Sequence, residues 1–263
     1  MKRFFPFALS LLLAPAITHA QFGGLRVNSN TVKGLGNAIN AASLTDEQVV
    51  AYARQGVKWM DENNPVAPEG SPFAKRLAKI VKNHQEIDGL KINYKVYMVK
   101  DINAFACADG SVRVFAGLMN IMDDEELLAI MGHEIGHVVN HDTRDAMKSA
   151  LNRSAVRNIA ASQSGGVGQI ARSELGGFAN AMIDASYSRK QESEADDYSY
   201  EFLKKHNYNV VALATSFEKL AKLSDESGQM KMATDKLMSS HPDSAKRAKR
   251  VRDQAKKDDL LKE

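Results

Sequence analysis

The chain of 263 residues holds a single cysteine, Cys107, and carries no large surplus of one charge. One cysteine cannot form an internal disulfide, which excludes the small secreted folds that disulfides hold together. Cys107 is therefore either a small buried residue or a thiol that cross-links to a partner or responds to redox conditions. The balance of 35 basic against 32 acidic side chains gives no reason to expect nucleic acid as a partner.

Long apolar runs are missing beyond the N-terminus, because no later segment reaches the roughly eighteen apolar residues that a membrane helix needs. Residues 1–20 have a basic start, an apolar stretch from Phe4 to Ala16, and small residues at Thr18 and Ala20. This pattern predicts a signal peptide and an exported protein; a retained membrane anchor is the alternative. Gln21 follows the expected cleavage site, so no lipoprotein cysteine is seen there.

The rest of the chain is expected to form a flexible N-terminal arm and one domain. Residues 21–44 are rich in glycine and asparagine and show weak periodicity. Thr45-Asp46-Glu47-Gln48 fits a helix capping box, so order is expected to begin there. Residues 45–263 have the length of a single domain with a sizeable core. The glycine-rich segment 164–177 is either a surface connector or a lid over an active site.

Strand-like alternation is confined to one region. Residues 92–99 and 111–115 alternate with period two, and Asp109-Gly110 is a turn signal before the second run. Together with residues 103–106 they predict a three-stranded meander with Ala104 to Cys107 as a candidate edge. Helical spacing predicts the other elements, at about 45–62, 71–84, 123–162, 188–205, 209–223 and 243–258, with a polar loop at 224–232. The expected fold class is α+β, mostly helical, with a small three- to four-stranded sheet.

The strongest motif is His133-Glu134-Ile135-Gly136-His137, which reads His-Glu-x-x-His on a predicted helix. Two histidines four residues apart share one helix face, one turn from each other, so both can bind a single tetrahedral metal ion. Glu134 is then in reach of the attacking water as a general base, as in zinc peptidases. The alternative is two solvated helix histidines. The surrounding helix is apolar over much of its surface, however, and burial of these polar groups favours a metal.

A third ligand has to come from elsewhere in the chain. Glu192 and Asp196 are four residues apart on a predicted helix, so they share a face. Glu192 is the candidate third ligand, which with His133 and His137 gives the open His₂Glu set of catalytic zinc. Asp196 is expected to accept the free N–H of a ligating histidine. A solvated acidic face is the alternative. His141 lies too far along the helix to complete the same shell, and His84 and His206 are expected at the surface.

The two motifs together resemble those of the HtpX-like and CAAX-prenyl-protease-like zinc metallopeptidases. The resemblance spans about residues 45–252. Further matching segments, in the family's order, are Asn103-Ala104-Phe105-Ala106, Gly117-Leu118 and His241-Pro242 with Arg247. Within the family the chain resembles the periplasmic LoiP group, through Tyr94–Met98, Glu194–Tyr200 and Ala212–Leu223.

This resemblance implies a compact gluzincin fold with one zinc ion per subunit between the two motif helices. It implies that Asn103, Ala104, Phe105 and Ala106 form an edge strand that pairs with extended substrate, although an ordinary strand is the alternative. His241 is either an oxyanion-stabilising catalytic residue, a fourth and inhibitory metal ligand, or a plain loop histidine. Arg247 either pairs with a carboxylate of the site, such as Asp196, or lies at the surface.

The function predicted from the sequence is a zinc-dependent endopeptidase of the bacterial envelope, with Glu134 as general base, acting on unfolded or misassembled proteins. The expected location is the periplasm, and the expected substrates are polypeptides. Peripheral association with the membrane, or with an outer-membrane assembly partner, is left open. A chaperone-like assembly factor or partner-binding protein with a largely latent peptidase site is the alternative.

Overall fold

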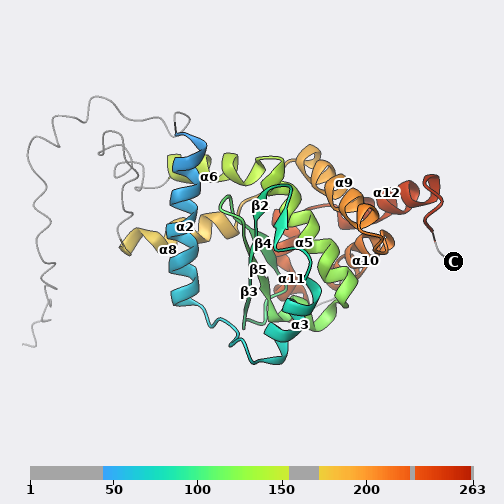
Figure 1. Ribbon diagram of the computed structural model, residues 1–263, viewed down its shortest axis with the longest axis horizontal. Helices are drawn as coiled ribbons and strands as arrows, with labels where there is room; N and C mark the ends of the chain where they lie inside the picture. Colours follow the sequence, from blue (N-terminus) through green and yellow to red (C-terminus); the bar gives the residue numbers. More distant parts are fainter. Residues whose placement is uncertain (1–43, 154–171, 226–228, 262–263) are drawn as a thin grey trace, which may run out of the picture.

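The computed structural model describes residues 44–153, 172–225 and 229–261 (Figure 1). The predicted signal peptide, the predicted arm up to residue 43 and the larger part of the 164–177 segment lie outside the described residues.

Helices dominate the described residues and surround two small sheets, which confirms the predicted mostly helical α+β class. The helices are α2 (Asp46–Asn63), α3 (Pro72–Ile80), α4 (Ala116–Ile121), α5 (Asp124–Val139), α6 (Asp142–Arg153), α8 (Arg172–Ile183), α9 (Arg189–Lys205), α10 (Val211–Asp225), α11 (Gln229–Ser240) and α12 (Ser244–Lys257). The strands are β1 (Glu86–Ile87), β2 (Leu90–Lys91), β3 (Asn93–Tyr97), β4 (Ala104–Ala106) and β5 (Ser111–Phe115).

The predicted meander is wrong in its strand order. The three-stranded sheet has the order β3-β5-β4, in which β5 runs parallel to β3 and antiparallel to β4. The backbone N–H of Gly117 donates to the carbonyl of Val99, so the segment after β3 crosses the end of β5 before the chain returns as β4. The other edge of β3 pairs with Val66 through a bridge to Tyr97. The prediction of β4 as an edge strand is therefore confirmed among the described strands.

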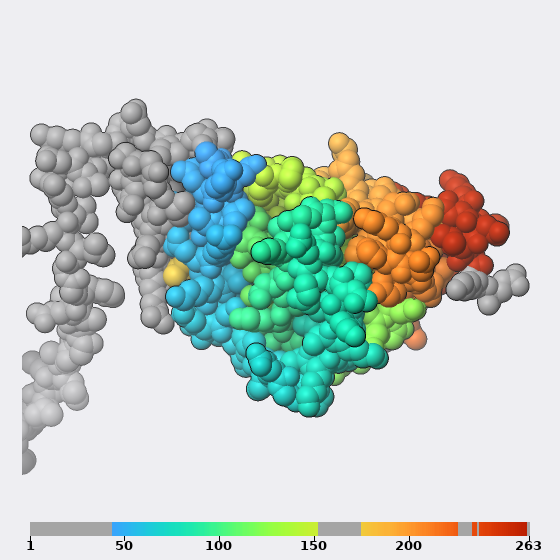
Figure 2. Space-filling view, viewed as in Figure 1, coloured from blue at the N-terminus to red at the C-terminus, as the bar shows by residue number. Residues whose placement is uncertain are grey.

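Side chains of the sheet alternate between two hydrophobic clusters, one on each face, as the two-residue period of a strand requires. Val96, Val112 and Val114 pack in a cluster with residues of α5, α9, α10 and α12. Tyr97, Phe105 and Phe115 pack on the opposite face with residues of α2, α6 and α8. Figure 1 shows the sheet between α2 and α8 on one side and α5, α10 and α12 on the other. In Figure 2, α2 (blue) and the α9–α10 region (orange) lie at opposite ends of one face.

The central helix is α5, and it lies very close to α9. A Cβ atom at Gly136 would come within 3.1 Å of both the Cα and the carbonyl oxygen of Ala195, so a side chain there would push the two helices apart. A Cβ atom at Gly132 would lie 2.9 Å from the hydroxyl of Ser199. Two glycines one turn apart thus allow the helix that carries the histidine motif to approach the helix that carries Glu192.

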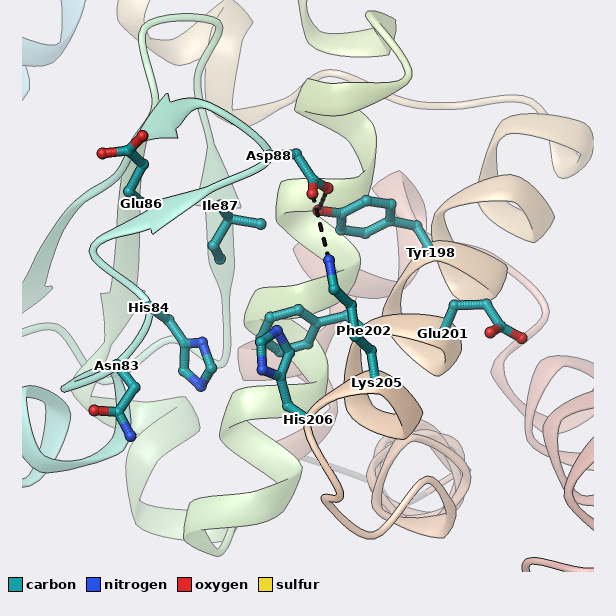
Figure 3. Close-up of a pocket in the computed structure, with 10 residues that line it drawn as sticks. All are labelled: Asn83, His84, Glu86, Ile87, Asp88, Tyr198, Glu201, Phe202, Lys205 and His206. Carbon is teal, nitrogen blue, oxygen red and sulfur yellow. Dashed lines mark hydrogen bonds and ion pairs between the residues drawn. The ribbon is translucent and has the colours of Figure 1, made fainter.

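Further details differ from the sequence predictions. Helix α11 (Gln229–Ser240) was not predicted, and Gly176 and Gly177 lie inside helix α8 instead of in a connector. His84 is only 2% exposed, whereas it was expected at the surface. Its Nε2 lies 2.9 Å from the hydroxyl of Tyr208, and its ring packs against Phe202. His84 lines a cavity of about 520 Å³ between the β1–β2 hairpin and the end of α9. Figure 3 shows the residues around this cavity.

None of the helices in the described part of the chain is both long enough and apolar enough to span a bilayer.

Candidate metal centre

Local sequence fixes the start of each of the two motif helices. Asp123 caps α5 and forms a reciprocal capping box with Glu126, and Ser188 does the same for α9 with Gln191. Helix α5 is buried along most of its length, and His133, Glu134 and His137 are 3%, 3% and 0% exposed. Such polar groups are costly to bury unless partners satisfy them, so their contacts define what the site can do.

Four side chains from three segments meet at one point. His133 and His137 come from α5, Glu192 from the first turn of α9, and His241 from the loop between α11 and α12. One ligand atom of each lies within 4.8 Å of all the others, and all four residues are buried. The Nε2 atoms of His133 and His137 are 3.2 Å apart. Glu192 Oε1 is 3.4 Å from His137 Nε2, and Glu192 Oε2 is 3.6 Å from His133 Nε2.

These distances fit a tetrahedral metal ion. Zn–N and Zn–O bonds of about 2.0–2.2 Å at tetrahedral angles separate neighbouring ligand atoms by about 3.3–3.5 Å. The three separations among His133, His137 and Glu192 cluster around that value. Two imidazole nitrogens that face each other at this distance repel unless a cation or a proton lies between them. The residues present therefore suit zinc in chemistry and in spacing.

Each histidine of the motif has its own carboxylate partner. His133 Nδ1 lies 3.0 Å from Asp196 Oδ1, and His137 Nδ1 lies 2.9 Å from Asp142 Oδ2. An ionised carboxylate only accepts hydrogen bonds, so the proton of each ring resides on Nδ1. When the ring is neutral, the lone pair of each Nε2 then faces the centre of the cluster.

Arg247, from α12, neutralises the acidic side of the site. Its guanidinium contacts both oxygens of Asp196, at 2.9 and 2.5 Å, and Nη1 lies 2.5 Å from Glu192 Oε2. The three side chains are 6%, 0% and 2% exposed, so this is a fully buried ion-pair network. The sequence left open whether Arg247 pairs with Asp196 or lies at the surface, and the structure shows the pairing.

Burial and charge shift the pKa values in opposite directions across the site. Burial, together with the Arg247 guanidinium, lowers the pKa of His133 to about 3, so this ring is neutral at pH 7. Burial alone would lower the pKa of His137, but its contacts with Asp142 and Glu192 outweigh this and raise the pKa to about 9. Binding of a cation at His137 is therefore expected to release a proton. Burial raises the pKa of Glu134, which brings this carboxyl closer to the range useful for a general base.

His241 completes the cluster from the loop between α11 and α12. Its Nδ1 lies 2.9 Å from Glu192 Oε1 and 3.3 Å from His133 Nε2, and its Nε2 lies 3.6 Å from Glu134 Oε1. The ring of Tyr187 stacks on the ring of His137, with centroids 3.8 Å apart and an interplanar angle of 16°. His241 thus contacts both the candidate ligands and the candidate base.

The structure brings together all of the residues that the sequence singled out for the metal, and the roles assigned to them stay predictions. Asn103 lies just before the edge strand β4, and Ala104 to Ala106 form that strand. It packs against α5, and all four residues are buried. Sequence reasoning missed Asp142 and Tyr187. His141, just before Asp142, has a φ of +69°, and this left-handed residue turns the chain so that Asp142 faces back to His137. No periodic pattern in the sequence signals such a turn.

Comparison with known proteins agrees with this geometry. Residues 73–255, more than two thirds of the chain, match Peptidase family M48. The chain belongs to peptidase family M48. It is 42% identical over 253 residues to Metalloprotease LoiP of Escherichia coli (strain K12), which covers 95% of this chain and 98% of LoiP. It is 43% identical over 231 residues to Metalloprotease YcaL of the same organism, which covers 88% of each chain.

A more distant match is the putative beta-barrel assembly-enhancing protease of Vibrio cholerae, 29% identical over 196 residues, 70% of this chain and 40% of that protein. The chain is thus a metallopeptidase of the M48 family, similar to LoiP. The family resemblance inferred from the sequence motifs is confirmed.

The buried Arg247 network yields a stability prediction for the metal-free protein. Replacement Arg247→Leu leaves Asp196 and Glu192 buried without their cation, and we expect it to lower the free energy of unfolding by about 3–5 kcal/mol. Arg250→Leu is the matched control, because Arg250 lies on the same helix and pairs with the half-exposed Asp197. We expect the control to change stability by about 1 kcal/mol or less. Urea unfolding measures both, and equal effects in the two variants would contradict the account.

Proposed function

We propose that this metallopeptidase is a zinc-dependent endopeptidase of the bacterial envelope that cleaves unfolded or misassembled polypeptides. The observation that supports it most is the approach of two imidazole Nε2 atoms and the Glu192 carboxylate to within 3.2–3.6 Å of one another. Neutral imidazoles and one carboxylate are the ligand set of catalytic zinc, which takes three protein ligands and leaves one position open. One ion per subunit follows from one such cluster among the described residues.

The residues around the ion divide the work of peptide hydrolysis. Zinc, when bound, polarises the scissile carbonyl and lowers the pKa of water to about 7. Glu134 removes a proton from the attacking water and later delivers it to the nitrogen of the leaving amine. The raised pKa of Glu134 lets this carboxyl hold the proton between the two transfers. Asp196 and Asp142 keep the two histidines in the tautomer that turns Nε2 towards the ion.

The free edge of β4 is the proposed docking site for substrate. Phe115 N–H donates to Asn103 O, and Cys107 N–H donates to Ser111 O, so Asn103 and Cys107 belong to hydrogen-bonded pairs of the β4–β5 ladder. In an antiparallel pair such residues alternate with residues whose N–H and C=O point away from the partner strand. Ala104 and Ala106 therefore turn their backbone groups towards the free edge. An extended polypeptide binds there through backbone hydrogen bonds, which suits substrates of varied sequence.

The proposed location is the periplasm. It is supported by the predicted signal peptide of residues 1–20 and by the similarity to LoiP, whose group the sequence resembles. The match to a putative beta-barrel assembly-enhancing protease motivates a peripheral association with the membrane or with an outer-membrane assembly partner. The near balance of charges gives no reason to add nucleic acid to the partners.

Glu134→Gln tests the proposed chemistry. Glutamine keeps the shape of the side chain but cannot accept the proton, so we expect casein hydrolysis to fall by about 10²–10⁴-fold while zinc stays bound. Glu125→Gln makes the same change at an exposed position of α5 and should leave hydrolysis unchanged. Protease assays alongside zinc analysis by mass spectrometry measure both. Retained cleavage in Glu134→Gln refutes Glu134 as the base.

Ala106→Pro tests the edge strand. Proline removes the N–H that points to the free edge but breaks no hydrogen bond of the β4–β5 ladder, and proline is tolerated in this way at sheet edges. We expect kcat/KM for a long peptide to fall by about tenfold, the equivalent of one lost hydrogen bond. Ala106→Ser keeps the N–H at similar size and is the control. Equal kinetics for Ala106→Pro and wild type, with zinc bound in both, would exclude docking at this edge.

A largely latent peptidase with a chaperone-like or partner-binding role is the second candidate. The observation in its favour is the position of His241, whose Nδ1 lies among the three proposed ligands. A fourth protein ligand gives zinc the closed shell of a structural site and leaves no position for water or substrate.

His241→Ala separates the active form from the latent one. If His241 closes the site, its removal opens the fourth position, and we expect the rate of casein hydrolysis to rise several-fold at unchanged zinc content. His206→Ala, an exposed histidine at the end of α9, is the control. A fall in rate would instead assign His241 to stabilisation of the transition state, as the other interpretation of the sequence holds.

A further inference from the structure

His137 is held by a set of contacts that the histidine motif does not predict. Its Nδ1 donates to Asp142 at the start of α6, and its ring stacks on Tyr187 in the segment between α8 and α9. The second oxygen of Asp142 accepts a hydrogen bond from Gln191 Nε2, 2.8 Å away, in the first turn of α9. Asp142 is 5% exposed, so both of its hydrogen bonds are shielded from water.

Gln191 performs two tasks with the two ends of one amide. Its Oε1 accepts from the backbone N–H of Ser188, which makes Gln191 the N3 residue of the α9 capping box. Its Nε2 donates to Asp142 on a different helix. The residue that fixes the start of α9 therefore also orients the carboxylate behind His137. Because Glu192 is the next residue, the same turn of α9 presents a proposed metal ligand and supports another.

The two histidines differ in the charge behind them. Asp196, behind His133, is paired at both oxygens with the Arg247 guanidinium. Asp142, behind His137, has the neutral Gln191 amide as its other partner, and apart from His137 no basic side chain of the described residues lies within ion-pair distance of it. A carboxylate that is not balanced by a cation polarises its imidazole more strongly and attracts a nearby divalent ion more strongly.

We propose that Asp142 and Gln191 are a positioning pair that sets how tightly this protein holds its metal, through His137. The proposal rests on the proposed function in one respect, namely that His137 binds zinc. Asp142 fixes the tautomer and the orientation of the ring, and its uncompensated charge strengthens His137 as a donor. Gln191 keeps the carboxylate directed at His137 and links that orientation to the cap of the helix that carries Glu192.

Asp142→Asn tests the charge. Asparagine can still accept the Nδ1–H of His137 but carries no charge, and we expect the zinc affinity to fall by about 10–100-fold. Asp145→Asn is the matched control, since Asp145 is the other acidic residue in the first turn of α6. Its zinc affinity should stay within about twofold of wild type. Competition of the metal-free proteins with a chromophoric chelator gives the dissociation constants without any use of enzyme activity.

Gln191→Ala and Ser188→Ala together separate the positioning role from the helix cap. Both substitutions break the capping box of α9, so both should lower the urea midpoint of the metal-free protein, Gln191→Ala by the larger amount because it also leaves a buried oxygen of Asp142 without its donor. Only Gln191→Ala also removes the hydrogen bond to Asp142. We expect zinc affinity to fall at least fivefold more in Gln191→Ala than in Ser188→Ala. Equal zinc affinities in the two variants would show that Gln191 acts only as a capping residue, and would refute its proposed role in orienting Asp142.

The outcomes distinguish this proposal from the proposed function. If the wild type binds one zinc and Asp142→Asn binds it equally well, the positioning pair is refuted and the zinc endopeptidase stands. If Asp142→Asn loses zinc affinity as expected but the wild type cleaves no polypeptide, the positioning pair stands and the endopeptidase is refuted. A wild-type protein that binds no zinc refutes both.

Discussion

The structure depends on the close contact between α5 and α9. A helix with three buried polar residues on one face is unstable unless a neighbour satisfies them, and α9 is that neighbour. Gly132 and Gly136 remove the side chains that would hold the helices apart. The same contact that buries the apolar face of α5 therefore brings a carboxylate to the two imidazoles. One helix–helix contact therefore forms both the core of the fold and the candidate metal site. Neither helix alone supplies all three proposed ligands.

Around this contact the charged and polar groups form an inner and an outer set. The innermost groups are two imidazoles and the Glu192 carboxylate, and the next are Asp196 and Asp142, each of which orients one ring. Arg247 offsets the negative charge on the His133 side and reaches Glu192 as well. Buried carboxylates of this kind are unfavourable without cations. A divalent ion would compensate the negative charge that Arg247 does not balance. His241, on a loop between two helices, is the one member of the cluster whose segment can change the coordination without disturbing the α5–α9 contact.

Sequence alone predicted the parts of the site that depend on short spacing. His133 and His137 share a face, as do Glu192 and Asp196, because residues four apart always lie on the same face of a helix. The capping signal at Thr45 located the start of the first helix, and the alternation of residues 92–99 and 111–115 located strands. What could not be predicted depends on long-range arrangement. The order β3-β5-β4 is set by how the chain passes the end of β5, and Asp142 reaches His137 through a left-handed turn at His141. The burial of His84 depends on the packing of Tyr208, more than a hundred residues away.

The central claim is that one ion is held jointly by α5 and α9. The most direct measurement is anomalous X-ray diffraction at the zinc edge from crystals of the metal-loaded protein. The account predicts one peak per subunit, about 2.0–2.2 Å from Nε2 of His133, Nε2 of His137 and a carboxylate oxygen of Glu192. A peak that lies against the two histidines but away from Glu192, or no peak between the two helices at full zinc loading, would contradict it.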